Sequence, residues 1–212
     1  MMKNLRLLLL TSLFAALAFG ADKVAYLNMD KAFNGYYRTL QENYLFEQQM
    51  LAYREKLQIM QEEFQNALKE AESAREAAED ELASAADREE SKRRFQVFAE
   101  RVQAKEREIM RSRQTELAKL QERQETTVKK LAAELTQKVK EFAKTKGLTH
   151  VYEVSGFSLS QMPFLLVYPE ELEITEEFSK AINQGHELEL KEAKDKLATL
   201  PSHAATKAQT TK

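Results

Sequence analysis

A long stretch of this chain, between Gly35 and Gly147, contains neither glycine nor proline. Those two residues disfavour a helix interior most strongly, so their absence allows an uninterrupted helix. Apolar residues inside the stretch recur every seven positions in two series, offset alternately by four and three. The first series is Phe46, Tyr53, Met60, Ala67 and Ala74, and the second is Met50, Leu57, Phe64, Ala71 and Ala78. Such an a/d pattern predicts a left-handed coiled coil that tapers as its seam residues shrink to alanine.

One straight helix of this length would extend about 165 Å, at about 1.5 Å per residue, with its apolar stripe in water. We therefore expect an antiparallel hairpin arm over residues 38–146. The turn is expected near 83–87, because Asp87 followed by Glu90 resembles a capping box that restarts a helix. A second apolar stripe follows the turn, with Phe95, Phe98, Val102 and Ile109 as its clearest members. Residues 111–127 contain few apolar side chains, which predicts loose packing there.

The two halves of the predicted hairpin carry opposite net charge. Residues 38–87 contain five basic and twelve acidic residues, whereas residues 88–130 contain thirteen basic and eight acidic ones. Each exposed ion pair stabilises a protein by only about 0 to 1 kcal/mol. The asymmetry therefore favours the pairing of these two helices more than it favours stability.

Both flanks of the helical stretch, residues 21–37 and 147–186, contain strand-forming sequence. Residues 23–29, 148–154 and 164–168 are enriched in β-branched and aromatic side chains, and Thr175 begins a short helix that carries Phe178 and Ile182. Three short strands and one helix make a poor independent core, so we expect this body to need partners. Trimerisation into a shared barrel or sheet would remove its exposed edges. Its candidate body residues are Val24, Tyr26, Leu27, Val151, Val154, Leu165 and Val167.

The predicted fold class is therefore mainly α with a small β-containing trimerisation body, from which a long antiparallel coiled-coil hairpin projects. After the body, residues 187–212 are expected to form a helical extension and a disordered tail. Leucines interspersed with charge favour the helix, and the small polar residues after Pro201 favour disorder.

The first twenty residues have the layout of a cleaved secretory signal peptide. Lys3 and Arg6 precede an apolar run, and small residues stand before Ala21. The run is shorter than the roughly 20 residues of a membrane span, although an uncleaved membrane anchor is the alternative. We therefore expect an exported protein. Because cysteine is absent, its stability must come from helix packing or oligomerisation rather than from disulfides.

The sequence offers no arrangement of residues typical of an enzyme. His150, His186 and His203 lack the spacing of a metal site, and neither a nucleophile motif nor a phosphate-binding glycine loop is present. We expect no cofactor and no bound metal. The net charge of −2 becomes −4 without Lys3 and Arg6, which argues against nucleic acid as a partner.

One basic cluster near the predicted turn could contact anionic lipid or lipopolysaccharide phosphates. It consists of Arg88, Lys92, Arg93 and Arg94. Neighbouring acidic residues, including Glu89 and Glu90, cancel much of its field, so a solvated surface is the alternative interpretation.

Three segments resemble the OmpH-like family of periplasmic chaperones, also called Skp. Residues 23–33, KVAYLNMDKAF, resemble the opening strand of the family and the turn that follows it. Residues 172–178, LEITEEF, resemble the start of its final helix, and Gly147-Leu148 followed by Val151-Tyr152 resembles its second strand entry. The stretch 155–171 looks longer than is usual in the family, and the tail after Gly185 is an addition.

The resemblance implies a homotrimer with three helical arms around a cavity, which holds unfolded outer-membrane proteins without ATP. A holdase of this kind needs many adaptable contacts, for which methionine and aromatic side chains are suited. The candidate client-contact residues are Phe46, Met50, Tyr53, Met60, Phe64 and Met110, which are equally candidates for the hairpin seam. The alternative function is a structural coiled-coil spacer or envelope tether with an uncleaved N-terminal anchor.

Overall fold

The computed structural model describes residues 22–201, and the chain divides into two compact units. Within the described part, one unit combines residues 22–36 with 132–187, and the other combines residues 37–131 with 188–201. The predicted signal peptide and the last eleven residues of the predicted tail lie outside the described residues. No helix between residues 22 and 201 is long and apolar enough to cross a membrane.

The first unit contains a two-stranded parallel sheet of β1 (Val24–Leu27) and β2 (His150–Glu153). Val24 lies opposite His150, and Leu27 lies opposite Glu153. Parallel strands need a crossover connection, and here it consists of α2 (Met29–Asn34), α3 (Tyr37–Glu79) and α4 (Ala85–Lys146). The two strands predicted on either side of the helical stretch are thus paired with each other.

Helix α2 begins where the side chain of Asn28 accepts a hydrogen bond from the amide of Lys31 at 2.8 Å. The cap is thus Asn28 and not the nearby Asp30, which lies in the first turn of the helix. Asparagine is as effective a cap as aspartate. The backbone amide of Asn28 in turn donates to Thr175 Oγ1 at 2.8 Å, which ties the start of α2 to the start of α5 (Thr175–Asn183).

The core of the first unit centres on α5. Phe178 is fully buried and packs edge-on against Phe142, with 5.5 Å between the ring centroids. Asn183 Nδ2 donates to the carbonyl of Gly35 at 3.0 Å, so α5 also satisfies the end of α2. A short 3₁₀ helix, η1 (Glu170–Leu172), precedes α5.

The prediction of a third strand at residues 164–168 was wrong. Residues 165–169 have no ladder partner in the described chain, and the pairing nearby is limited to an isolated antiparallel bridge between Phe157 and Pro163. The sequence composition was strand-like, but a strand exists only where a second strand accepts its hydrogen bonds. Leu166 and Val167 are instead 73% and 87% exposed.

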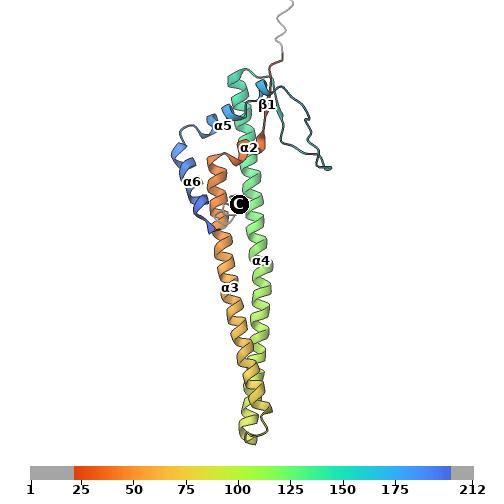
Figure 1. Cartoon of the computed structure of the whole chain (residues 1–212), viewed down its shortest axis with the longest axis vertical. Helices are drawn as coiled ribbons and strands as arrows, with labels where there is room; N and C mark the ends of the chain where they lie inside the picture. Colours follow the sequence, from red (N-terminus) through yellow and green to blue (C-terminus); the bar gives the residue numbers. More distant parts are fainter. Residues whose placement is uncertain (1–21, 202–212) are drawn as a thin grey trace, which may run out of the picture. The chain divides into compact units, whose positions relative to one another are not determined.

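In the second unit, α3 and α4 pack together as an antiparallel hairpin (Figure 1). Ion pairs join the helices, among them those from Lys56 to Glu116, from Glu63 to Lys105 and from Glu70 to Arg101. As the residue number rises along α3 it falls along α4, which is the register of a hairpin. The fold class is therefore confirmed as mainly helical, with a long helical hairpin and a small parallel sheet.

The seam of the hairpin follows the predicted heptads. Tyr53, Met60, Ala67 and Ala74 of the first series are buried, as is Ala71 of the second. On α4, the corresponding positions include Phe98, half-buried Lys105 and buried Ser112, which follow one another at intervals of seven. Because two of these three are polar, α4 supplies much less apolar surface to the seam than α3 does.

The turn of the hairpin comprises residues 80–84, between the end of α3 and the start of α4. Ser84 caps α4, because its hydroxyl oxygen lies 3.2 Å from the amide nitrogen of Asp87 and accepts its hydrogen bond. The hydroxyl itself donates to the Asp87 carboxylate at 2.7 Å. Asp87 therefore occupies the third helical position of the capping motif rather than the cap itself, which shifts the turn by about three residues from the predicted one.

Helix α6 (Glu187–Thr199) is separated from α5 by a turn at residues 184–186, where Gly185 has a φ of 80°. Glycine adopts this left-handed conformation without a steric penalty. Ala193 and Leu197 of α6 are buried, and the helix lies beside α3 (Figure 1).

Candidate binding surface of the helical hairpin

The surface of the hairpin outside the seam carries several exposed large apolar side chains. Those on α3 share no heptad position with the buried seam residues of that helix, and charged residues separate them. Those on α3, α4 and the turn are Leu45, Ile59, Leu68, Leu82, Val97, Met110 and Val128, with exposed fractions from 37% to 96%. Scattered apolar groups on a charged surface can make many weak contacts without a single specific site.

The predicted contact residues are mostly seam residues in the structure. Tyr53 and Met60 are buried, and Phe46, Met50 and Phe64 are half-buried. Met110 is different, because it is 57% exposed and lies outside the seam. The heptad pattern therefore accounts for five of the six predicted contact residues by packing alone.

Sequence reasoning missed Ile59 and Val97, which are 57% and 63% exposed. A signal for them was present. Each is a large apolar residue that stands outside the heptad series, so the seam does not explain it. Apolar residues that a periodic pattern leaves over are thus better contact candidates than the residues that define the pattern.

A groove, which we call the seam groove, opens between α3 and α4 at residues 49–56 and 116–123. Its volume is about 490 Å³. Ala52, Tyr53 and Leu120 form its apolar part, and Lys56, Lys119 and Arg123 are among its charged lining residues. The groove falls within the stretch that the sequence predicted to be loosely packed.

Two buried hydroxyls accompany this loosely packed stretch. The Tyr53 hydroxyl and Ser112 Oγ have no hydrogen-bond partner among the described residues, although the two residues are only 8% and 5% exposed. An unpaired buried hydroxyl costs about 1 to 3 kcal/mol. This part of the seam is therefore held less firmly than the alanine-rich part near the turn.

Lys105 lies at a seam position but keeps its charge through partners on both helices. Its Nζ is 2.6 Å from the carboxylate of Glu63 on α3 and 3.2 Å from that of Glu108 on α4. The hydrogen bonds from Lys105 to Glu63 and then to Glu108 raise the pKa of the lysine above its ordinary value. An acidic residue of α3 thus pairs with a basic residue of α4, in agreement with the charge asymmetry of the two helices.

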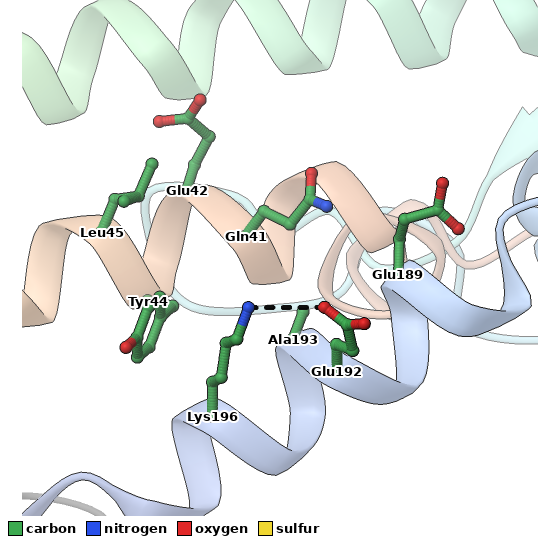
Figure 2. Close-up of a pocket in the computed structure, with 8 residues that line it drawn as sticks. All are labelled: Gln41, Glu42, Tyr44, Leu45, Glu189, Glu192, Ala193 and Lys196. Atoms are coloured by element: carbon green, nitrogen blue, oxygen red, sulfur yellow. Dashed lines mark hydrogen bonds and ion pairs between the residues drawn. The ribbon is translucent and has the colours of Figure 1, made fainter.

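A second groove, of about 270 Å³, lies between α3 and α6 (Figure 2). Tyr44 and Leu45 contribute from α3, and Ala193 contributes from α6. Figure 2 also shows the ion pair between Glu192 and Lys196, at 3.4 Å, along the α6 side of the groove. Helix α6 therefore covers part of α3 with a small buried side chain, which leaves a gap between the helices.

The predicted anionic-ligand residues lie near the start of α4. Lys92, Arg93 and Arg94 are exposed, and Arg88 is half-buried. The Lys92 ammonium is 4.0 Å from the Glu89 carboxylate, and the Arg94 guanidinium is 5.9 Å from the centre of the Phe98 ring. Intrahelical partners thus engage part of the cluster.

In the first unit, four of the seven predicted body residues lie in the two strands, and the other three follow β2 in the chain. Leu27 is buried, and Val24, Tyr26, Val151, Val154 and Leu165 are half-buried, whereas Val167 is exposed. The Tyr26 ring stacks on Tyr152 and Tyr168, at centroid distances of 6.0 and 5.0 Å. A stacked, partly exposed aromatic face therefore covers one side of the sheet.

The segment after β2 is ordered by Glu153. Its carboxylate accepts hydrogen bonds from the amides of Ser155 and Gly156, both at 2.7 Å, and from the amide of Met29 at 3.3 Å. Burial alone would raise the pKa of Glu153, but these bonds and one from the Ser155 hydroxyl outweigh it and hold the pKa below its ordinary value.

Beyond this anchor, residues 155–169 contain no charged residue. Their apolar side chains are exposed rather than buried, with Phe157, Leu159, Met162, Phe164, Leu166 and Val167 between 58% and 104% exposed. An exposed apolar segment beside an incomplete sheet is typical of a surface that a further chain covers.

No group of histidine and carboxylate residues within residues 22–201 is arranged to hold a metal ion. The carboxyl of Glu173 receives hydrogen bonds from Thr175 and Tyr168, which lower its pKa. Its partner Tyr168 donates at 2.8 Å, and this bond raises the pKa of the tyrosine. Both groups have a structural role at the junction of β1, η1 and α5.

Comparison with known families gives one match. The family is described as outer membrane protein (OmpH-like), and its model matches residues 23–182, which is more than half of the chain. The match begins at β1 and ends in α5, so α6 lies beyond it. No curated protein matches the chain.

Proposed function

We propose that this chain, which belongs to the OmpH-like (Skp) family of non-enzymatic chaperones, is a periplasmic holdase for unfolded outer-membrane proteins. The observation that carries the proposal is the hairpin surface. Seven large apolar side chains are exposed there, among many charged residues. Such a surface can hold an unfolded chain by many weak contacts and keep it apart from other unfolded chains.

The proposed mechanism uses binding alone. Each exposed apolar side chain, such as Ile59 or Val97, gains a modest stabilisation when a client side chain covers it. Because the contacts are separate, a client stays bound while individual contacts break and form again. No nucleotide is needed to release the client, since folding into the membrane removes its apolar segments from the equilibrium.

The proposed assembly is a homotrimer that joins the first units of three chains. Two observations support it. A two-stranded sheet is too small to be stable by itself, and the uncharged segment 155–169 exposes its apolar side chains beside that sheet. The trimer would place three hairpins around a shared cavity, in which the client is held.

Export by a cleaved signal peptide belongs to the same proposal, because the clients cross the periplasm. A weak contact between the basic cluster of α4 and anionic lipid or lipopolysaccharide remains a further proposal for Arg88, Lys92, Arg93 and Arg94. The exposure of the last three supports it, and the ion pair between Lys92 and Glu89 limits its strength.

The experiment that tests the holdase proposal replaces exposed apolar residues without touching the seam. In the variant Ile59→Gln, Val97→Gln, Met110→Gln, each change removes a contact group that is more than half exposed. We expect the variant to keep the stability and oligomeric state of the native chain, and to form less complex with a denatured outer-membrane protein in size-exclusion chromatography with light scattering. Unchanged complex formation would contradict the assignment of the hairpin surface as the client-binding surface.

A further inference from the structure

We propose that the seam groove binds an apolar side chain of a polypeptide that carries a carboxylate beside it. This inference rests on the proposed holdase function and names a sequence preference within it. The occupant is a segment of an unfolded client in which leucine-like and acidic residues are neighbours.

The groove exists because the α4 side of the seam carries charged rather than apolar residues at this point. On α3 the heptad continues with the large ring of Tyr53, but on α4 the facing positions carry Glu116 and Lys119, whose charged ends leave the interior. Ala52 adds no bulk on the α3 side. The apolar surface of Tyr53 and Leu120 is thus left with space above it.

The size of the groove suits a side chain rather than a solvent molecule. Its volume of about 490 Å³ lies in the range of pockets that hold small organic ligands. It lies open along the hairpin between α3 and α4, so an extended polypeptide can cross it and insert one side chain without threading its end. A long acyl chain would extend past the groove, because only about two turns of each helix line it.

The charges around the groove select an anion. Lys56 is neutralised by Glu116, whose carboxylate oxygen lies 2.5 Å from Nζ. Lys119 and Arg123 form no ion pair within residues 22–201, and their spacing of four places both on one face of α4. Two unpaired cations thus stand beside an apolar surface, and a carboxylate next to an inserted apolar side chain would meet them.

The test uses full-length mature protein and three labelled, unstructured peptides that differ in one repeated unit, Leu-Leu-Asp, Leu-Leu-Asn or Leu-Leu-Lys. We expect the native chain to bind the Asp peptide roughly fivefold more tightly than the Asn peptide, as two exposed ion pairs allow. The variant Lys119→Gln, Arg123→Gln is expected to bind both equally. The variant Lys119→Glu, Arg123→Glu is expected to prefer the Lys peptide.

The matched control is Arg107→Gln, Arg111→Gln. These arginines have the same spacing of four on α4, are exposed and lie outside the groove. The net charge changes by the same amount as in the variant Lys119→Gln, Arg123→Gln. The control should keep the preference for the Asp peptide. If the control lost the preference for the Asp peptide as fully as the Gln groove variant, net charge alone would explain the preference and the inference would be overturned. The absence of a preference in the native chain would overturn it as well.

Three further outcomes separate related explanations. If decanoate displaced the Asp peptide from the native chain but not from the Gln variant, the groove would be an amphiphile site and the polypeptide assignment would be overturned. If the native chain prevented aggregation of a denatured outer-membrane protein but showed no preference between peptides, the holdase proposal would stand and the groove inference would fail. A peptide preference without any effect on aggregation would contradict the holdase proposal instead.

Discussion

The carboxylate of Glu153, the last residue of β2, accepts a hydrogen bond from the amide of Met29, the first residue of α2, at 3.3 Å. The two residues are 124 positions apart in the chain. The same carboxylate also receives the amides of Ser155 and Gly156. The Glu153 side chain therefore links the end of β2 to the start of α2 and positions the first residues of the uncharged segment that follows.

Replacement of Glu153 by glutamine should destabilise the first unit. The amide keeps one acceptor oxygen but presents an NH₂ group where the carboxylate accepted a second set of hydrogen bonds. We expect a loss of about 1 kcal/mol, since hydrogen bonds to a charged group are strong but this group is partly screened by solvent. Urea unfolding monitored by circular dichroism measures it. A variant as stable as the native chain at pH 7 would show that the carboxylate does not contribute to stability.

The stability of the protein should fall at acidic pH through Glu153 and Glu173. Hydrogen bonds lower the pKa of both carboxyls in the folded state. A lowered pKa means that their contribution is present above the ordinary glutamate pKa of about 4.3 and is lost as the pH falls through the folded-state pKa. The urea midpoint followed from pH 7 to pH 3 tests this. The difference between the native chain and Glu153→Gln should close over the same range, and a constant difference would argue against the assignment.

The replacement Met60→Ala should destabilise the hairpin by about 2 to 4 kcal/mol, because it leaves a cavity in the seam. Met60 is only 6% exposed. The neighbouring residue gives a matched control, since Ile59 is 57% exposed and Ile59→Ala should change stability by no more than about 0.5 kcal/mol. Thermal unfolding of the two variants compares them. Equal effects would mean that the heptad seam is not the interior of the hairpin.

The replacement Ser112→Ala should stabilise the protein. Its hydroxyl is buried without a partner in the described part of the chain, so its removal relieves a desolvation cost of about 1 to 3 kcal/mol. Alanine also favours helices, and Ser73→Ala at an exposed position of α3 measures that contribution alone. We expect the midpoint in urea to rise more for Ser112→Ala than for Ser73→Ala. A smaller rise would indicate that Ser112 finds a hydrogen-bond partner in solution.

The helical hairpin could be predicted from the sequence because its apolar pattern repeats at a regular spacing. The spacing of seven from Tyr53 to Ala74 places side chains on one face of a helix whatever follows, and these residues are buried as expected. The loose stretch was predictable for the same reason, since residues 111–127 lack the apolar groups that would fill the seam groove.

Features that depend on a single partner were not predictable in the same way. Residues 164–168 have the composition of a strand, but within residues 22–201 no second strand pairs with residues 165–168. Several polar residues near each helix start could cap it, and only the backbone geometry selects Asn28 and Ser84 over Asp30 and Asp87. The exposure of Ile59 and Val97 followed from the register of the seam, which must be known before the residues outside it can be identified.

The holdase role is tested most directly by the light scattered by a denatured outer-membrane protein after dilution from urea, with and without the mature chain in molar excess. Many weak contacts along the hairpin should keep the client dispersed, so we expect the rise in scattering to be suppressed without ATP. A rise that is as fast and as large with the chain as without it would rule out the holdase role.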